Sequence, residues 1–292
     1  MKYMITGASG QLGSEWVRYF SGHQISFSGF NSLQLDITDR EAVQHALQRE
    51  KPDVVINCAA YTKVDQAEKD VEKAFLVNET GVRNLVDACG ETGSFLIHYS
   101  TDYVFPGKNE DRQIYPDGYT EDTATDPVNT YGKSKKAGEI IIKNSTVNWL
   151  LIRVSWLCGA EGSNFVKTML KLAQDRDKID VVDDQSGSPT FAFDVVEKSF
   201  ELIQKKKSGI YHISSKGEIS WADFAKKIFE LSGKFVEVNR IPSSQFPVLA
   251  ERPSYSLLST GKIEKAGLKP INWETGLKKL LKNLHYLYQP NN

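Results

Sequence analysis

A tyrosine and a lysine four residues apart, Tyr131 and Lys135, are the side chains of this sequence best suited to move a proton. On a helix, residues at this spacing share one face, so the ammonium would lie near the phenol. A nearby positive charge stabilises tyrosinate and lowers the phenol pKa from about 10, which lets a tyrosine act as a general acid. We therefore predict that Tyr131 and Lys135 form a catalytic pair.

Their spacing alone is weak support, because 12 tyrosines and at most 36 lysines in 292 residues produce roughly one such pair by chance (12 × 36/292). Their position after a predicted strand at 95–100 gives the pair its weight. That strand ends in Ser100 and Thr101, which brings hydroxyl groups to the carboxyl edge of a sheet, where ligands of such folds bind. We expect Thr101 or Ser100 to orient a substrate carbonyl oxygen and His98 to be a hydrogen-bonded core residue.

A glycine-rich turn, Gly7, Gly10 and Gly13, follows the first predicted strand directly and opens the first predicted helix. In such a turn, one glycine permits the tight bend, one lets the backbone approach a pyrophosphate, and one lets helix and strand pack closely. The helix N-terminus adds a preference for negative charge. The turn predicts that the chain binds a dinucleotide.

The end of the second predicted strand, Ser28 to Ser32, carries no acidic residue to hold a ribose 2′-hydroxyl, as NAD-binding proteins usually do there. It also carries no arginine or lysine to pair with a 2′-phosphate. Both NADPH and NADH are therefore candidate cofactors, with NADPH mildly favoured.

Short apolar runs alternate with amphipathic stretches of helix length through the first half of the chain. This pattern predicts βαβ units and a doubly wound parallel sheet of the Rossmann type. The expected strands are 2–6, 25–28, 54–57, 95–100 and 150–154, and the expected helices are 11–20, 39–50, 71–90, 131–144, 164–175 and 221–232.

The pattern becomes less regular after about residue 155, which favours a smaller C-terminal lobe that binds substrate. We expect residues 1–155 to form the dinucleotide-binding domain, completed by segments near 191–213, and residues 156–190 and 214–292 to form the substrate-binding lobe. The polar, turn-rich segment 106–127 is typical of a long surface loop, and its place near the predicted site suggests a lid.

Composition excludes several classes of partner. The formal net charge is −1, so no basic excess favours nucleic acid or an anionic membrane. No apolar stretch is long enough for a membrane span or a signal peptide, so we expect a cytoplasmic protein that acts on a small molecule. The three cysteines stand singly and are expected to be buried thiols.

With these motifs in place, the sequence resembles the extended short-chain dehydrogenase/reductase family over nearly its whole length. The resemblance is carried by TGASGQLG at 6–13, LDITD at 35–39, NCAAYTKVDQAE at 57–68, STDYVFPG at 100–107, YGKSKKAGE at 131–139, RVSWLCG at 153–159, DDQSGSPT at 183–190 and AERPSYSLL at 250–258. It implies a reductase that uses NADPH or NADH and takes a thymidine-diphospho-ketosugar, dTDP-4-dehydrorhamnose, as its substrate.

The resemblance also implies roles for individual residues. Thr101, Tyr131 and Lys135 would be catalytic, and Thr101, Asp102 and Trp156 would meet the sugar. The cofactor would contact the glycine turn, the segment after the second strand, the segment after the third strand and the catalytic helix, through Gly7, Gly10, Gln11, Leu12, Gly13, Asp36, Ile37, Ala59, Ala60, Tyr61, Thr62, Tyr99, Tyr131 and Lys135.

Some members of the family dimerise through magnesium held by a glutamate of the first helix and an acid just after the GxPT motif. Glu15 is present here, but Phe191, Ala192 and Phe193 follow Thr190. We therefore expect no metal site, and a monomer or weak homodimer.

Two alternatives stay open at this point. One is another nucleotide-sugar enzyme of the same family, such as an epimerase, a dehydratase or a different 4-ketosugar reductase. The other is a non-catalytic, reductase-like regulatory subunit of methionine adenosyltransferase, although an intact Thr101, Tyr131 and Lys135 favour an enzyme.

Overall fold

Short runs of apolar residues build one six-stranded sheet in the computed structural model, which describes residues 1–288. All five neighbouring pairs of strands are parallel, in the order β10-β5-β4-β3-β1-β2. The predicted doubly wound parallel sheet is confirmed, with the second strand two residues later than expected. The strands are β1 (Tyr3–Thr6), β2 (Phe27–Phe30), β3 (Val54–Asn57), β4 (Phe95–Thr101), β5 (Trp149–Val154) and β10 (Gly209–His212).

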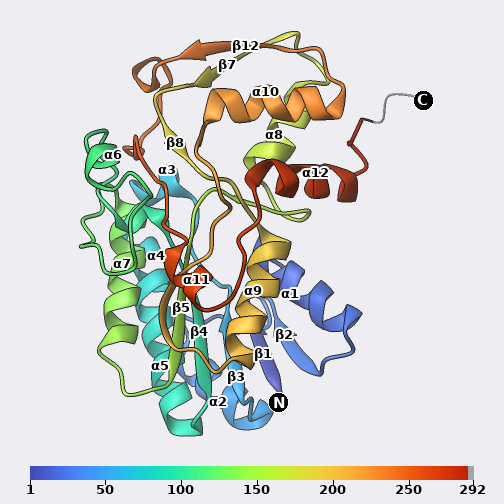
Figure 1. The fold of residues 1–292 in the computed structure, drawn as a ribbon. Coiled ribbons are helices and arrows are strands. Elements are labelled where there is room, and N and C mark those ends of the chain that lie inside the picture. The colour runs from blue at the N-terminus through green and yellow to red at the C-terminus, as the bar shows by residue number, and fades with distance from the viewer. Residues whose placement is uncertain (289–292) are drawn as a thin grey trace.

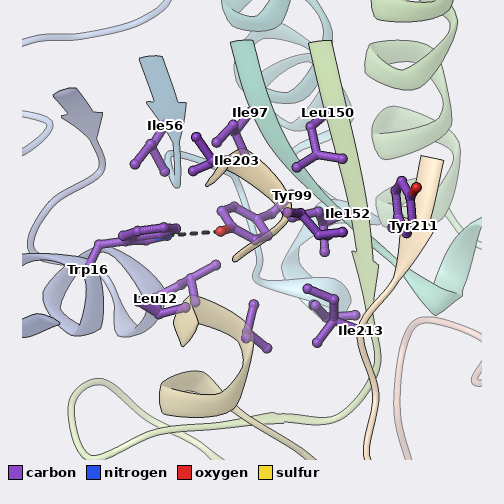
Figure 2. Close-up of a cluster of buried hydrophobic side chains, with 14 of the residues drawn as sticks. Leu12, Trp16, Ile56, Ile97, Tyr99, Leu150, Ile152, Ile203, Tyr211 and Ile213 are labelled. Atoms are coloured by element: carbon purple, nitrogen blue, oxygen red, sulfur yellow. Dashed lines mark hydrogen bonds between the residues drawn. The ribbon is translucent and has the colours of Figure 1, made fainter. Parts of the chain in front are cut away.

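Helices cover both faces of this sheet (Figure 1). On one side lie α2 (Arg40–Glu50), α5 (Gly81–Thr92) and α7 (Thr130–Lys143), and on the other lie α1 (Gln11–Gly22) and α9 (Ala192–Gln204). Each layer encloses its own apolar core, because the strands are buried on both faces. Figure 2 shows part of the core beneath α1 and α9, where Trp16 meets Tyr99.

The helix expected at 71–90 is instead three consecutive pieces: α4 (Val71–Phe75), a π-helical turn at Leu76–Thr80, and α5. The π turn contains Asn78, whose buried side chain donates to the carbonyl of Tyr61 and to the hydroxyl of Ser134. A π turn in a helix often marks a functional position. Here it joins the segment after β3, which includes the short α3 (Val64–Ala67), to the helix that carries Tyr131.

A smaller layer lies beyond the carboxyl edge of the sheet (Figure 1). It contains α8 (Phe165–Leu172), α10 (Trp221–Ser232), α12 (Trp273–Asn283) and the parallel pair β7 (Lys178–Val182) and β12 (Glu237–Ile241), around a separate apolar core. The predicted domain boundaries at 155, 191 and 213 stay a prediction.

The remaining short elements are β6 (Leu157–Cys158), β8 (Ser186–Gly187), β9 (Thr190–Phe191), β11 (Ile219–Ser220), α11 (Gly261–Lys265) and two 3₁₀ turns (Asp102–Val104 and Ser243–Gln245).

The segment 106–127, which was expected to be a surface loop and a lid, packs against other parts of the chain at several residues. It contains the short helix α6 (Asp111–Ile114), and its Tyr119 is fully buried and stacked on Phe105, with ring centroids 4.4 Å apart. Gly118 has a φ of 90°, and a Cβ there would lie 2.7 Å from the carbonyl carbon of Leu258. The predicted surface loop is thus present over most of the segment, but Gly118 and Tyr119 are buried because the C-terminal segment packs against them. Its role as a lid stays a prediction.

Among residues 1–288, none of the helices combines the length and the apolarity that crossing a bilayer requires.

Candidate active site

The turn after β1 has room only for glycine. Gly7 has a φ of 65°, in the left-handed region, and a Cβ there would lie 2.6 Å from the backbone nitrogen of Ala59. A Cβ on Gly13 would lie 2.1 Å from the carbonyl oxygen of Gly7. The N-cap of helix α1 is Gly10, which offers no side-chain cap to the N–H groups of the first turn. This cradle fits the pyrophosphate of a dinucleotide, which those N–H groups would bind.

The next two residues of the turn face different surroundings. Gln11 donates from Nε2 to the carbonyl of Leu157 at 2.9 Å and accepts from Asn164 Nδ2 at 2.9 Å. Leu12 is buried in the core under α1 (Figure 2). Gln11 therefore ties the expected pyrophosphate site to the segment that leads into α8.

The segments after β2 and β3 lie next to this cradle. Asp36 is exposed and accepts from the backbone and hydroxyl of Thr38, whereas Ile37 is buried beneath Gly81. Ala59, Ala60 and Tyr61 are half-buried and Thr62 is exposed, which leaves this stretch accessible at the sheet edge. Their expected contacts with the cofactor stay a prediction.

Tyr99 places its side chain in the core rather than at the site. Its ring is only 7% exposed, its hydroxyl accepts from Trp16 Nε1 at 2.9 Å, and it donates to Ser199 Oγ at 2.9 Å (Figure 2). The backbone of Tyr99 is what reaches the site, since its carbonyl accepts a hydrogen bond from Lys135.

Thr101, Asp102 and Tyr131 come together where β4 ends and α7 begins. Asn129 caps α7 by accepting from the backbone of Gly132, which fixes the start of the helix. Thr101 Oγ1 donates to Asp102 Oδ1 at 2.8 Å and accepts from the backbone of Tyr103 at 3.2 Å. Its proton must turn away from Asp102 before Thr101 can donate to a substrate oxygen.

The pKa of Tyr131 differs from the expectation. Burial raises the pKa of this phenol above its ordinary value, and hydrogen bonding with Thr101 opposes that shift. The prediction that the pKa of Tyr131 is lowered is therefore wrong. A raised pKa keeps the proton on Tyr131 at neutral pH, so the residue retains the protonated form that a general acid requires.

Lys135 is almost fully buried, with 2% of its surface exposed. Its Nζ atom donates to the carbonyl oxygen of Tyr99 at 2.7 Å and lies 3.3 Å from Nε2 of His98. Burial lowers the pKa of Lys135 to about 8, although Glu139 and Cys58 act in the opposite direction. At pH 7 this lysine is therefore mostly charged, and its charged and neutral forms balance near pH 8.

A buried ion pair holds the catalytic helix against the sheet. Glu139 of α7 accepts two hydrogen bonds from Arg153 of β5, at 2.9 and 2.7 Å, and both side chains are buried. Bidentate pairing of this kind fixes geometry as well as charge. It sets where Tyr131 and Lys135 stand relative to the end of β4.

Trp156 lies on the other side of the site in an unusual conformation. Its φ of 45° is in the left-handed region, its ring stacks on Trp221, and its Nε1 donates to Ser256 at 2.9 Å. The strained backbone and the fixed ring are consistent with a residue held in place to pack against a ligand.

A cavity of about 1120 Å³ opens next to these residues, with walls from both layers of the molecule. Tyr103 connects it to the catalytic helix, because its ring lies edge-on to that of Tyr131 with centroids 5.6 Å apart. Arg252, also in the wall, forms an ion pair with Asp65 of α3. The cavity is lined mainly by Phe165, Met169, Leu172, Trp221, Phe246 and Arg252.

Residue-by-residue reasoning missed Asp65, Tyr103 and Arg252. Arg252 lies in the AERPSYSLL stretch, which was the only signal in the sequence that this part of the chain takes part in the site. Its partner on α3 could not be found from spacing, because the two residues meet only through folding.

Residues 1–286 match the family model described as RmlD substrate binding domain. The chain belongs to this family. It is 38% identical to a dTDP-4-dehydrorhamnose reductase of Aggregatibacter actinomycetemcomitans, over 96% of this chain and 98% of that protein. It is 39% identical to the spore coat polysaccharide biosynthesis protein SpsK of Bacillus subtilis, over 96% of both chains.

A solved structure shares the fold closely. The dTDP-4-dehydrorhamnose reductase of Bacillus anthracis, in complex with NADP, superposes with a TM-score of 0.92 at 40% identity, covering 97% of this chain and 99% of that one. The expected relationship to dTDP-4-dehydrorhamnose reductases is confirmed, and the chain is an oxidoreductase of the RmlD family.

Glu15 and the residues after Thr190, which bear on the expectation about magnesium, make other contacts. Glu15 pairs with Arg18, and Phe191 is buried against Gly276. Within residues 1–288, no three His, Cys, Asp or Glu side chains gather closely enough to hold a metal ion. The expectation that the protein has no metal site stays a prediction.

Proposed function

We propose that this protein reduces the C4 ketone of dTDP-4-dehydro-β-L-rhamnose to give dTDP-L-rhamnose, with NADPH or NADH as the reductant. The observation that carries the proposal is the meeting of Thr101 and Tyr131 where β4 ends and α7 begins, with Tyr131 packed edge-on against Tyr103 in the wall of the cavity. Membership of the RmlD family supports the choice of substrate.

The cofactor, when bound, supplies the hydride that adds to the ketone carbon. The backbone of Gly10, Gln11 and Leu12 would hold its pyrophosphate, Asp36 and Ile37 would lie beside the adenine, and Ala59 to Thr62 would lie on the ribose side. Lys135, as an ammonium, would hold the hydroxyl groups of the nicotinamide ribose.

Tyr131 donates its proton to the oxygen as negative charge develops there, and Thr101 donates a hydrogen bond to the same atom. Asp102 stands beside Thr101 and can take part in holding the sugar, while Trp156 offers its fixed ring as a packing surface. Burial of Tyr131 and Asp102 strengthens each polar contact, because a closed site contains little water to screen the charges.

An assay of the purified protein with dTDP-4-dehydrorhamnose tests this function. We expect one mole of NADPH or NADH to be oxidised for each mole of sugar reduced, and parallel runs with the two cofactors give the preference between them. An epimerase or dehydratase that recycles its cofactor would show no net oxidation, which would overturn the proposal.

The regulatory alternative makes a different prediction. A reductase-like regulatory subunit would bind NADP without turning over the sugar and would copurify with a methionine adenosyltransferase.

The proposal further treats the protein as a monomer or weak homodimer. Light scattering over a range of protein concentrations measures its oligomeric state.

A further inference from the structure

His98 is a buried histidine that lies between Asn57 and Lys135. It occupies β4, three residues before Thr101, and only 1% of its surface is exposed. Its Nδ1 atom lies 2.9 Å from Asn57 Nδ2, and its Nε2 atom lies 3.3 Å from Lys135 Nζ. The ring therefore contacts the catalytic helix directly from the strand below it.

The hydrogen bonds of Asn57 determine which nitrogen of His98 carries the proton. The backbone N–H of Ala59 can only donate, and it meets Asn57 Oδ1 at 3.1 Å, so the oxygen of this amide points toward Ala59. Thr6 also donates to that oxygen at 2.7 Å. The amide nitrogen must therefore face His98, and because it can only donate, Nδ1 of His98 must be an acceptor.

A neutral imidazole that accepts at Nδ1 carries its proton at Nε2. Burial and the Lys135 charge lower the pKa of His98 well below its ordinary value, so the ring is neutral. The Nε2–H group then points toward Lys135 Nζ. An ammonium has only N–H groups to present to it, whereas a neutral amine presents a lone pair that accepts the hydrogen bond, while still donating to the Tyr99 carbonyl.

We propose that His98 is a positioning residue for Lys135: held by Asn57 as the Nε2–H tautomer, it directs an N–H group at Nζ and favours the neutral amine. The proposal rests on the proposed function in one respect, namely that the ammonium form of Lys135 is the one that holds the ribose of the cofactor.

Two other groups near Lys135 act against His98. Glu139 of the same helix and Cys58 at the end of β3 both favour the ammonium, while burial favours the neutral amine and lowers the pKa of Lys135 to about 8. His98 on β4 is the polar side chain that adds to the effect of burial. The charge of Lys135 therefore changes near pH 8.

The tautomer of His98 tests the geometric part of the proposal. In long-range ¹H–¹⁵N NMR spectra of the wild-type protein without cofactor, we expect His98 Nε2 to have the chemical shift of a protonated nitrogen and Nδ1 that of an unprotonated one. The signals of His98 are assigned by their loss in the His98→Leu variant. The opposite tautomer, or an imidazolium at neutral pH, would overturn the proposal.

The pH dependence of NADPH binding tests the consequence. In the wild type we expect affinity to fall above a pH of about 8, where Lys135 loses its proton. His98→Leu removes the N–H that faces Nζ and puts no donor in its place, so the midpoint should rise by about one pH unit, a tenfold change in proton affinity. An unchanged midpoint in a folded His98→Leu protein would contradict the proposal.

His212 supplies the matched control, because it is equally buried but lies next to Arg153 rather than Lys135. His212→Leu should leave the midpoint where it is in the wild type. A protein that fails to bind NADPH at any pH would argue against the proposed function, whereas one that binds NADPH with the other tautomer of His98 would argue against this inference alone.

Discussion

Trp156 and Trp221 stack face to face, with ring centroids 3.4 Å apart and planes inclined by 7°. The stack joins the segment after β5 to the start of α10 and supports the strained backbone of Trp156. Trp221 also lines the cavity. The ring expected to meet the sugar is therefore held by a residue that the sequence motifs did not include.

Replacing Trp221 with leucine should loosen Trp156 and weaken sugar binding. We expect the Trp221→Leu variant to raise the KM for the sugar by about 3- to 10-fold, roughly the worth of one aromatic pair, with the Kd for NADPH unchanged. Trp273→Leu is the control, because Trp273 packs on Phe224 in the same layer but not on Trp156. Equal effects of the two substitutions on KM would contradict this role.

Removing the hydroxyl of Tyr131 should stop catalysis without preventing cofactor binding. General acid catalysis by one side chain is worth about 10²- to 10⁴-fold, so we expect Tyr131→Phe to lose at least 100-fold in kcat. Fluorescence titration should show NADPH binding within about twofold of the wild type. A variant that reduces the sugar at a near-normal rate would rule out Tyr131 as the acid.

Asp102 should make stability depend on pH. Burial raises the pKa of Asp102 from 3.8 to about 7, and its Oδ2 atom has no hydrogen-bond partner within residues 1–288. The folded protein therefore holds this proton more tightly than the unfolded chain does, and its contribution to stability falls as pH rises from about 4 to 7.

Asp102→Asn removes this dependence, so the variant should gain stability relative to the wild type as pH rises from 5 to 8, by at most about 1.4 kcal/mol for each unit. Thermal unfolding of both proteins at the two pH values measures the difference. Asp117→Asn, at an exposed carboxylate, should show the same small difference at both values. A variant whose relative stability falls with rising pH would show that Asp102 is charged in the folded protein.

The glycine cradle should tolerate no side chain. Gly7→Ala would place a Cβ 2.6 Å from the Ala59 backbone at a left-handed φ, so we expect NADPH affinity to fall at least tenfold and the Tm to drop. Gly22→Ala, at the end of the same helix, meets no atom within 4 Å and should change the free energy of unfolding by less than about 1 kcal/mol. Unaltered binding by Gly7→Ala would mean that the cofactor does not use this turn.

The sequence by itself determined the sheet, the covering helices and the order of the chemical groups along the chain. Apolar runs near 2–6, 54–57 and 95–100 became β1, β3 and β4, because their periodicity and their flanking turns are local properties. Gly7 and Gly13 could be predicted for the same reason, since the tight turn between a strand and a helix allows only glycine at these positions.

Only the tertiary structure decided how those groups are surrounded. The Tyr99 carbonyl and His98 hold Lys135, burial raises the Tyr131 pKa where spacing predicted a lower one, and the segment around Tyr119 is covered by the chain near Leu258. Desolvation and hydrogen-bond geometry depend on residues that are distant in sequence and meet on folding. A spacing of four residues placed Tyr131 and Lys135 on one helix, but the packing of that helix against β4 set the protonation of both.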